Sequence, residues 1–283
     1  MPLPLVTIGV PVRNQEDSIL KALKSIDRQT YRNLEIIISD DFSSDRTLKI
    51  IKNFDWTNLI PKVFEQKSNL GLYENLFFTL NVSSGTYFMW LAGDDEISPE
   101  FISNCVRFLE SNQEYVAASA FPRYLTENGP TEGTCIDLAG NLRMRISNFL
   151  DISNLRNSHN IFYSLSRIEI ISGCLEIKKS YVALDWSVDY FLILHGKVKT
   201  DVEGFIQFGT KGVSRQPGVN RKFATKPIDF CLPYLRFTGY ILSQTIRRAP
   251  FEILRVIAFA INLNFVDIYE RLRHQMKLIV AKL

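Results

Sequence analysis

The fold is decided by the stretch LVTIGVPVRNQEDSILKALKSIDRQTYRNLEIIISDD (residues 5–41), in which two short apolar segments flank one amphipathic segment. The flanking segments, 5–12 and 34–39, are rich in β-branched residues, as strands buried on both faces of a sheet are. Between them, four apolar residues recur at helical spacing: Ile19, Leu20, Leu23 and Ile26. A strand, a helix and a second strand in this order predict a βαβ unit with parallel strands.

The same alternation continues as far as residue 121. Further strands are predicted over residues 59–66, 86–92 and 115–121, and helices over residues 44–54, 72–81 and 98–111. Ser98 and Pro99 would open the last helix as its N-cap and first residue. This pattern predicts an α/β fold: a Rossmann-like, mostly parallel sheet with helices on both faces.

Beyond residue 121 the pattern is looser. It predicts a hairpin or loop over 122–145, an apolar segment over 161–172 that packs on the sheet, a helix over 185–195, a strand over 198–209, and a basic loop over 211–222. From residue 227 onward the chain is predicted to be helical, with breaks at Pro233 and Pro250. We therefore expect a C-terminal helical extension after the α/β domain.

Composition and charge narrow the class of protein. The chain has 283 residues, of which 46% are hydrophobic and 22% charged, so an ordinary globular core is expected and a fully disordered chain is excluded. The net charge of +3 does not favour nucleic-acid binding. Residues 221–283, however, hold 11 Lys/Arg against 4 Asp/Glu. This basic tail either faces an anionic surface or uses its cations only for solubility.

The cysteines and the chain start favour a reducing compartment. Four isolated cysteines form no CxxC pair, which argues against a disulfide framework or a zinc site: Cys105, Cys135, Cys174 and Cys231. No signal-peptide pattern and no uncharged run of membrane-spanning length are present in the sequence. The expected location is the cytoplasm, with the inner face of the membrane as the alternative for the basic tail.

Polar residues follow three of the predicted strands at the point where each strand ends. They are Arg13 and Asn14 after the first strand, Asp40 and Asp41 after the second, and Gly93, Asp94 and Asp95 after the fourth. Ligands of parallel α/β sheets bind beyond the carboxyl ends of the strands. These residues are therefore the first candidates for a binding site.

The two acidic runs each allow two interpretations. In SDDFSSD (39–45), the acids either favour the start of the next helix or accept a hydrogen bond from a nucleotide base beside a helix N-terminus. In LAGDDEISP (91–99), the acids either precede the helix that opens at Pro99 or hold a hard divalent cation together with phosphate oxygens. Adjacent like charges repel unless they are solvated or bound to a cation.

The order of motifs resembles the family 2 glycosyltransferases. The matching motifs are Pro11-Val12-Arg13-Asn14, Gln29-Thr30-Tyr31, the run from Glu35 to Asp45, Asn69-Leu70-Gly71 with Asn75, and Gly85-Thr86-Tyr87. The resemblance is close over roughly residues 4–110 and looser over 160–200. It implies the GT-A fold and an inverting transfer of sugar from a nucleoside-diphosphate sugar. It also implies a GT-A domain over 1–222, with a nucleotide half to about residue 120 and an acceptor half after it, followed by the tail over 223–283.

The resemblance implies a role for each matched position. Asp41 would accept a hydrogen bond from the base, and the backbone of Val12 and Arg13 would flank that base. The remaining nucleotide-binding candidates are Pro11, Asn14, Asn69, Gly71, Asn75 and Gly93. Asp94 would ligate Mn²⁺ or Mg²⁺. Ala92 stands where the family pattern has the first Asp of Asp-x-Asp, and Asp95 is the candidate that would compensate.

The resemblance also implies a general base near the start of a late helix. Asp185 lies eleven residues before Gly196, as the family spacing requires, and Asp189 on the same helical face is the second candidate. Leu184 replaces the Glu that precedes the base in the family pattern. From position alone, Asp185 can equally be a helix N-cap. Lys211 and Arg215 could close over the diphosphate or lie in a solvated loop.

Three functions stay open at this level. The leading one is a glycosyltransferase acting on a glycan or lipid-linked acceptor in surface polysaccharide synthesis. The alternatives are a non-catalytic sugar-nucleotide-binding module, suggested by Ala92 and Leu184, and a nucleotidyltransferase, against which the absence of glycine in VPVRNQED argues. The basic tail would contact a membrane, cover the sheet or form a homodimer. His159 and His195 have no partner at metal-ligand spacing and are interpreted as structural.

Overall fold

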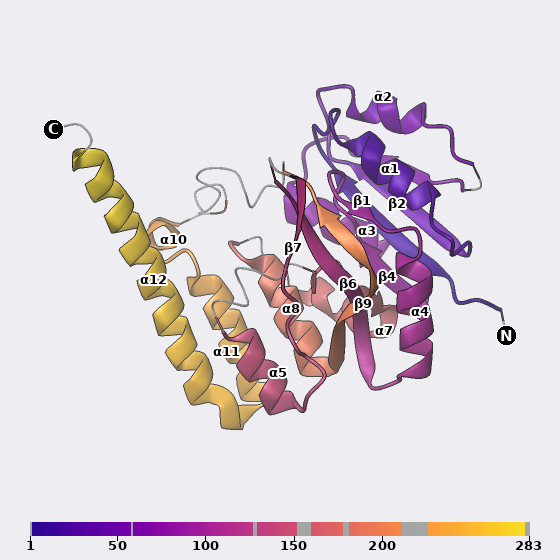
Figure 1. The fold of residues 1–283 in the computed structure, drawn as a ribbon. Coiled ribbons are helices and arrows are strands. Elements are labelled where there is room, and N and C mark those ends of the chain that lie inside the picture. The colour runs from indigo at the N-terminus through magenta and orange to yellow at the C-terminus, as the bar shows by residue number, and fades with distance from the viewer. Residues whose placement is uncertain are drawn as a thin grey trace.

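One mixed β-sheet organises the chain (Figure 1), and the computed structural model describes residues 2–57, 59–126, 129–151, 160–177, 181–210, 223 and 226–280. Over these residues the sheet has nine strands, in the order β3-β2-β1-β4-β8-β6-β9-β5, and β7 pairs with β6 off this path. Helices cover both faces of the sheet, as the sequence predicts.

The first half of the sheet is parallel, which confirms the prediction for this part of the chain. Its strands are β1 (Val6–Val12), β2 (Leu34–Asp40), β3 (Lys62–Glu65) and β4 (Tyr87–Trp90). β1 lies between β2 and β4 and is parallel to both. Every side chain of β1 except that of Pro11 is buried, because helices cover both faces of the sheet here.

The second half of the sheet is mixed. Its strands are β5 (Glu96–Ile97), β6 (Tyr115–Thr126), β7 (Gly129–Glu132), β8 (Leu165–Arg167) and β9 (Lys197–Phe208). β8 is antiparallel to both β4 and β6, whereas β9 is parallel to β6 and antiparallel to β5. β6 and β7 form the hairpin expected within residues 122–145. The short strand β8 therefore joins the parallel half to the second half.

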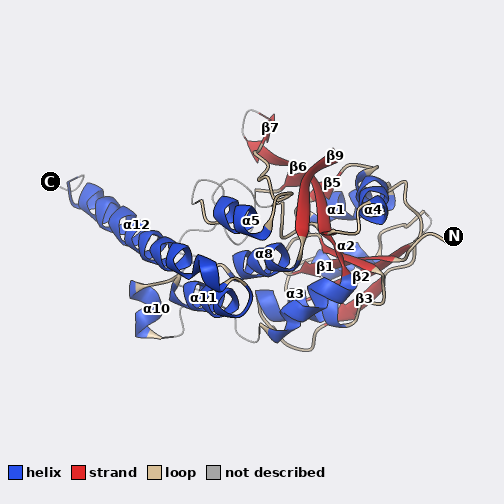
Figure 2. Ribbon diagram, turned by 90° about the horizontal axis from the view of Figure 1, so that it is seen from below, coloured by secondary structure: helices blue, strands red, loops and turns tan. Residues whose placement is uncertain are grey.

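The helices cover the two faces of the sheet, except for the C-terminal ones, which extend away from it (Figure 2). They are α1 (Ile19–Asp27), α2 (Thr47–Lys52), α3 (Leu72–Asn81), α4 (Phe101–Ser111), α5 (Leu142–Phe149), α7 (Ile168–Ile171), α8 (Leu184–His195), α10 (Pro227–Cys231), α11 (Leu235–Arg248) and α12 (Ile253–Val280). Helices α1 and α4 pack into one hydrophobic cluster with residues of β1 and β2. Helices α3 and α8 pack into a second cluster on the opposite face.

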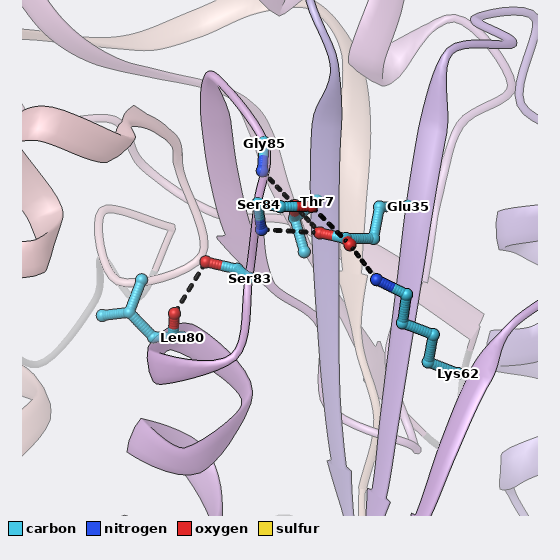
Figure 3. A network of polar contacts seen from close by, with 7 residues as sticks. All are labelled: Thr7, Glu35, Lys62, Leu80, Ser83, Ser84 and Gly85. Atoms are coloured by element: carbon cyan, nitrogen blue, oxygen red, sulfur yellow. Dashed lines mark hydrogen bonds and ion pairs between the residues drawn. The ribbon is translucent and has the colours of Figure 1, made fainter.

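A buried carboxylate holds the strands together at the amino ends of β1 and β2 (Figure 3). Glu35 accepts hydrogen bonds from Thr7 Oγ1 at 2.6 Å and from Ser84 N–H at 2.8 Å, and Lys62 Nζ lies 2.6 Å from its Oε1. Burial alone would raise the pKa of Glu35, but these hydrogen bonds outweigh it and lower the pKa to about 2. A Cβ at Gly85 would lie 2.6 Å from Thr7 Oγ1, so this position has room only for glycine.

The C-terminal helices share the hydrophobic cluster of α8. Phe237 and Val256 are completely buried in that cluster. Tyr190 Oη and Thr245 Oγ1 lie 2.7 Å apart and link α8 to α11. The first part of the predicted tail therefore packs against the body of the protein. Among the described residues, no helix combines the length and the apolarity needed to cross a bilayer.

The expected helix start at Ser98 and Pro99 is wrong. Helix α4 begins at Phe101 with Glu100 as its N-cap, and no side chain caps it. Ser98 Oγ instead accepts a hydrogen bond from Phe205 N–H at 3.1 Å. Glu96 and Ile97 form β5 against β9, so the acidic run precedes a strand rather than a helix. Pairing with a strand more than 100 residues away overrides the local helix-start signal.

Candidate active site

The loops after β1 and β2 are hydrogen-bonded to each other. Asn14 N–H donates to Ser43 Oγ at 2.9 Å, and Ser44 N–H donates to Asn14 Oδ1 at 2.8 Å. Asn14 and Phe42 both adopt positive φ, at 50° and 59°. Asparagine tolerates this backbone region, whereas a bulky aromatic residue rarely adopts it. Arg13 is exposed beside this junction, which lies at the carboxyl edge of the sheet.

Asp41 is buried at the end of β2 and fixes the loop before α3. Its two carboxylate oxygens accept hydrogen bonds from Leu70 N–H at 2.6 Å and from Gly71 N–H at 3.0 Å. Gly71 N–H also donates to Asn69 Oδ1 at 3.0 Å, and Gly71 has a φ of 95°, which favours glycine. Three of the predicted nucleotide-binding residues thus lie together. A carboxylate offers about four acceptor sites, so these bonds leave Asp41 capacity for a further donor.

Asn75 and Gly93 connect neighbouring elements at the same edge. Asn75 is buried on α3, where its side-chain amide accepts from Ser39 Oγ at 2.6 Å and donates to Ser39 O at 2.9 Å. It therefore holds α3 against β2. A Cβ at Gly93 would lie 2.2 Å from Gln15 Oε1 and 2.9 Å from Val12 Cγ1. The segment after β4 can approach the end of β1 this closely only because residue 93 is glycine.

The acidic pair after β4 lies against the end of β9. Asp95 is buried, and its Oδ1 accepts a hydrogen bond from Gly209 N–H at 2.9 Å. Asp95 N–H donates to Ala92 O at 3.1 Å and closes the turn. A Cβ at Gly209 would lie 2.3 Å from Asp94 O and 2.6 Å from Asp94 Oδ2. Gly209 therefore fixes Asp95 by a hydrogen bond and leaves space for the half-buried Asp94.

The start of α8 presents Asp185. Asp185 is half-buried in the first turn and is not the N-cap, because Ala183 occupies that position with a φ of 64°. Tyr73 of α3 is buried near this turn, and burial, followed by the charge of Asp185, raises the pKa of its hydroxyl well above the ordinary value. Asp189 is buried, and its Oδ1 has no hydrogen-bond partner among the described residues. Burial, followed by the charge of Asp185, raises the pKa of Asp189 well above its ordinary value.

Tyr163 lies just before β8, where the charges of the predicted site acids act on its hydroxyl. Its ring packs against Phe208, with centroids 5.4 Å apart, and contacts both hydrophobic clusters. Burial, followed by the charges of Asp95, Asp94 and Asp185, raises the pKa of the Tyr163 hydroxyl well above its ordinary value. Three carboxylates from two distant parts of the sequence thus act on one hydroxyl.

Comparison with known proteins identifies the family of this chain. The model of the glycosyl transferase family 2 matches residues 7–164, more than half of the chain. The chain belongs to this family. An uncharacterized glycosyltransferase of Haemophilus influenzae is 35% identical over 124 residues, which are 44% of this chain and 38% of the relative. The GalNAc(5)-diNAcBac-PP-undecaprenol beta-1,3-glucosyltransferase of Campylobacter jejuni is 32% identical over 114 residues, which are 40% of this chain and 36% of the relative. The matches thus span well under half of these relatives.

Solved structures confirm the GT-A fold of this family 2 glycosyltransferase. Staphylococcus aureus TarS 1–349 in complex with UDP-GlcNAc superimposes with a TM-score of 0.66 at 15% identity, over 90% of this chain and 70% of TarS 1–349. The mannosyltransferase PcManGT of Pyrobaculum calidifontis, in complex with GDP-Man and Mn²⁺, superimposes with a TM-score of 0.59 at 15% identity, over 95% of this chain and 73% of PcManGT. At this identity the likeness shows the fold alone.

Some predicted residues lie outside this cluster. Lys211, Arg215 and His159 fall outside the described residues. His195 ends α8, where its Nδ1 lies 2.7 Å from Phe191 O, which fits the predicted structural role. Within the described part of the chain, no three His, Cys, Asp or Glu side chains come together as a metal site. A cation held here would therefore need ligands beyond the protein side chains, such as phosphate oxygens.

The sequence did not predict four residues that shape the site. Tyr73 and Tyr163 lie in apolar helical and strand-like segments, where an aromatic residue is normally interpreted as core. Gly209 ends a predicted strand, and a glycine there gives only a turn signal. Gln15 follows Asn14, and the only available signal was its place just after a strand end.

Proposed function

We propose that this family 2 member is an inverting glycosyltransferase that moves a sugar from a nucleoside-diphosphate sugar to a glycan or lipid-linked acceptor in surface polysaccharide synthesis. The observation that carries this proposal is the position of Asp41 after β2 and of Asp94 and Asp95 after β4, at the carboxyl edge of the sheet, where Gly209 N–H donates a hydrogen bond to Asp95. The Campylobacter relative supports a lipid-linked acceptor, because its name describes a transferase acting on an undecaprenol-linked glycan. The complexes of TarS with UDP-GlcNAc and of PcManGT with GDP-Man support a nucleotide-sugar donor.

The residues at the end of β4 fit a Mn²⁺ or Mg²⁺ ion. Carboxylate oxygens are preferred ligands of both ions, and two carboxylates with diphosphate oxygens form a typical site. Asp94 is half-buried beside Gly209, which has no side chain to displace it. The Gly209 N–H group orients Asp95 by a hydrogen bond. Asp95 would compensate for Ala92, which brings no carboxylate. When bound, the ion would offset the negative charge of the leaving nucleoside diphosphate.

Side chains of the protein would bind the donor and take the proton of the acceptor. Asp41 would receive a hydrogen bond from the base, beside the backbone of Val12 and Arg13. Asp185 would take the proton of the acceptor hydroxyl as that oxygen attacks the anomeric carbon and the diphosphate leaves. Asp185 is favoured over Asp189, because Asp189 is almost completely buried and an acceptor hydroxyl cannot reach it. Lys211 and Arg215 would bind the diphosphate.

A turnover assay tests the proposal. The protein is incubated with UDP-, GDP- and dTDP-sugars, Mn²⁺ or Mg²⁺, and soluble or lipid-linked glycan acceptors, and release of nucleoside diphosphate is measured. We expect Asp185→Asn to lower the rate by about 10²–10⁴-fold with donor binding intact. Asp94→Ala should lower it by about a hundredfold, because the leaving charge is no longer offset.

The matched control is Asp201→Asn, which removes an exposed carboxylate of β9 that is paired with Lys199. It should leave turnover unchanged. Donor binding without release under every acceptor condition would instead support a non-catalytic binding module. Full activity of Asp185→Asn would rule out Asp185 as the base, and full activity of Asp94→Ala would rule out the proposed metal site.

A further inference from the structure

Asp189 is a buried acid that the proposed reaction does not use. It lies on α8, between the sheet and the C-terminal helices (Figure 1), and is only 3% exposed. Its neighbours along the chain, Val188 and Tyr190, are completely buried in the hydrophobic cluster of α8. Asp189 Oδ1 has no hydrogen-bond partner among the described residues. A buried polar atom without a partner destabilises a folded protein, so a carboxyl group at this position requires an explanation.

The elements around α8 offer Asp189 no counterion within the described part of the chain. Helix α8 packs mainly against α5, α7, α11, β6 and β9. Their cations that are not exposed each bind another partner: Arg123, Arg145, Lys197, Lys199 and Arg236. Their other charged residues are exposed: Arg143, Glu169, Asp201, Glu203, Arg247 and Arg248. The charge that acts on Asp189 is that of Asp185, and burial, followed by this charge, raises the pKa of Asp189 and favours the neutral acid.

Asp189 and Asp185 lie on adjacent turns of the same face of α8. They are four positions apart in the helix, which separates their Cβ atoms by about 5–6 Å. Side chains of a helix lean toward its N-terminus, which brings the Asp189 carboxyl group toward the turn of Asp185. Asp185 is half-buried, whereas Asp189 is buried. Because two negative charges this close would repel each other, the pair is expected to hold one negative charge, on the more exposed Asp185.

We propose that Asp189 is a positioning residue for Asp185, to which it donates a hydrogen bond as a neutral carboxylic acid. This inference rests on the proposed function, in which Asp185 is the base. A hydrogen bond from a neutral acid to a carboxylate is strong, and it would satisfy the buried carboxyl group. It would hold one oxygen of Asp185, so that the other oxygen faces the acceptor hydroxyl. Asp189 keeps its proton, while Asp185 takes the proton of the acceptor.

Two substitutions of Asp189 test the hydrogen bond in the turnover assay. Asp189→Asn keeps a neutral donor of the same shape, so its kcat should stay within about threefold of the wild type. Asp189→Leu has a similar branched shape but no donor. We expect its kcat to fall about tenfold while the KM for the nucleotide sugar stays unchanged, because the base is less well oriented. Circular dichroism confirms that both variants are folded.

Carbon-13 NMR tests the same bond without donor or acceptor, so its result is independent of the proposed transferase activity. The side-chain carboxyl carbons of aspartate are labelled, and the signal of Asp189 is the one that Asp189→Leu removes. At neutral pH we expect the signal of a protonated acid. In Asp185→Ala this signal should shift, because the oxygen that accepts the proton is gone. Asp201→Asn removes an exposed carboxylate of β9 and should leave the signal unchanged.

Three results would overturn the inference. One is an ionised Asp189 at neutral pH, because a carboxylate has no proton to donate. Another is an Asp189 signal that does not change in Asp185→Ala. The third is equal kcat in Asp189→Asn and Asp189→Leu. A protonated Asp189 whose signal shifts in Asp185→Ala, in a wild type without turnover on any donor and acceptor, would support the hydrogen bond and refute the proposed function.

Discussion

At Gly209, the backbone occupies space that a side chain would take from Asp94. A Cβ there would lie 2.6 Å from Asp94 Oδ2, which is closer than van der Waals contact allows. We predict that Gly209→Ala displaces this carboxylate and raises the Mn²⁺ concentration needed for half-maximal nucleoside diphosphate release by about tenfold. A metal titration of activity measures this shift.

Gly239→Ala is the control for this prediction. A Cβ at Gly239 meets no atom within 4 Å, and the residue lies inside α11. Alanine is the better helix former there, so the metal requirement should stay constant while stability rises by about 0.5–1 kcal/mol. An unchanged metal requirement in Gly209→Ala would mean that Asp94 is not a ligand.

Tyr73 is a positioning residue for Asp185. Its side chain is buried in the same hydrophobic cluster as Leu184, the residue just before Asp185, and the charge of Asp185 acts on its hydroxyl. We predict that Tyr73→Phe lowers kcat about fivefold and leaves the KM for the donor unchanged, because the first turn of α8 is less well fixed. Steady-state kinetics with a varied donor separate the two constants. Tyr269→Phe, at an exposed site on α12, should change neither, and a change in the donor KM alone would assign Tyr73 to donor binding.

At the scale of the elements, Glu35 joins β1, β2, β3 and the segment before β4. Its pKa is lowered to about 2 in the folded protein from an ordinary 4.5. A group with a depressed folded-state pKa stabilises the protein above its unfolded pKa and loses that effect as the pH falls toward the folded value. We predict that about 3 kcal/mol of the free energy of unfolding is lost between pH 4.5 and pH 2 through this group.

Denaturant titrations at several pH values check the Glu35 prediction. Glu35→Gln should be less stable by about 2–3 kcal/mol at neutral pH and should lose this part of the pH dependence. Glu65→Gln is the control, because Glu65 forms an exposed pair with Lys52 and should cost under about 1 kcal/mol. If the free energies of unfolding of the wild type and of Glu35→Gln fall in parallel from pH 4.5 to pH 2, acidic groups other than Glu35 cause the loss of stability at low pH.

The elements that the sequence predicts are those whose signal is local. β1, β2 and α3 follow from apolar runs and helical spacing within each segment. β5 has two residues and lies in an acidic run, and only its pairing with β9 makes it a strand. The same limit applies to the site. The acidic residues of the site could be predicted because they follow strands. Which aromatic hydroxyl their charges act on, here that of Tyr163, depends on tertiary packing.

At the scale of the whole molecule, the C-terminal helices and the glycosyltransferase body share one hydrophobic cluster. Phe237 of α11 is completely buried in it, together with residues of α8. We predict that Phe237→Ala lowers the free energy of unfolding by about 3–5 kcal/mol, because it leaves a cavity between α11 and α8. Chemical denaturation followed by circular dichroism measures the change.

Phe230→Ala provides the matched control, since Phe230 of α10 is 51% exposed. It should cost under about 0.5 kcal/mol. If Phe237→Ala is equally mild, or if two separate transitions appear, the C-terminal helices form an independent unit. For the wild type we expect one cooperative unfolding transition.

The bond between Gly209 and Asp95 also sets an order of events in folding. The two residues are 114 positions apart, whereas the strands of the parallel half are neighbours in sequence. Contacts between distant residues form slowly, because the intervening chain must first be ordered. In refolding experiments, secondary structure should therefore recover before nucleotide-sugar binding does. On the ribosome, Asp95 gains this partner only after residue 209 has been synthesised.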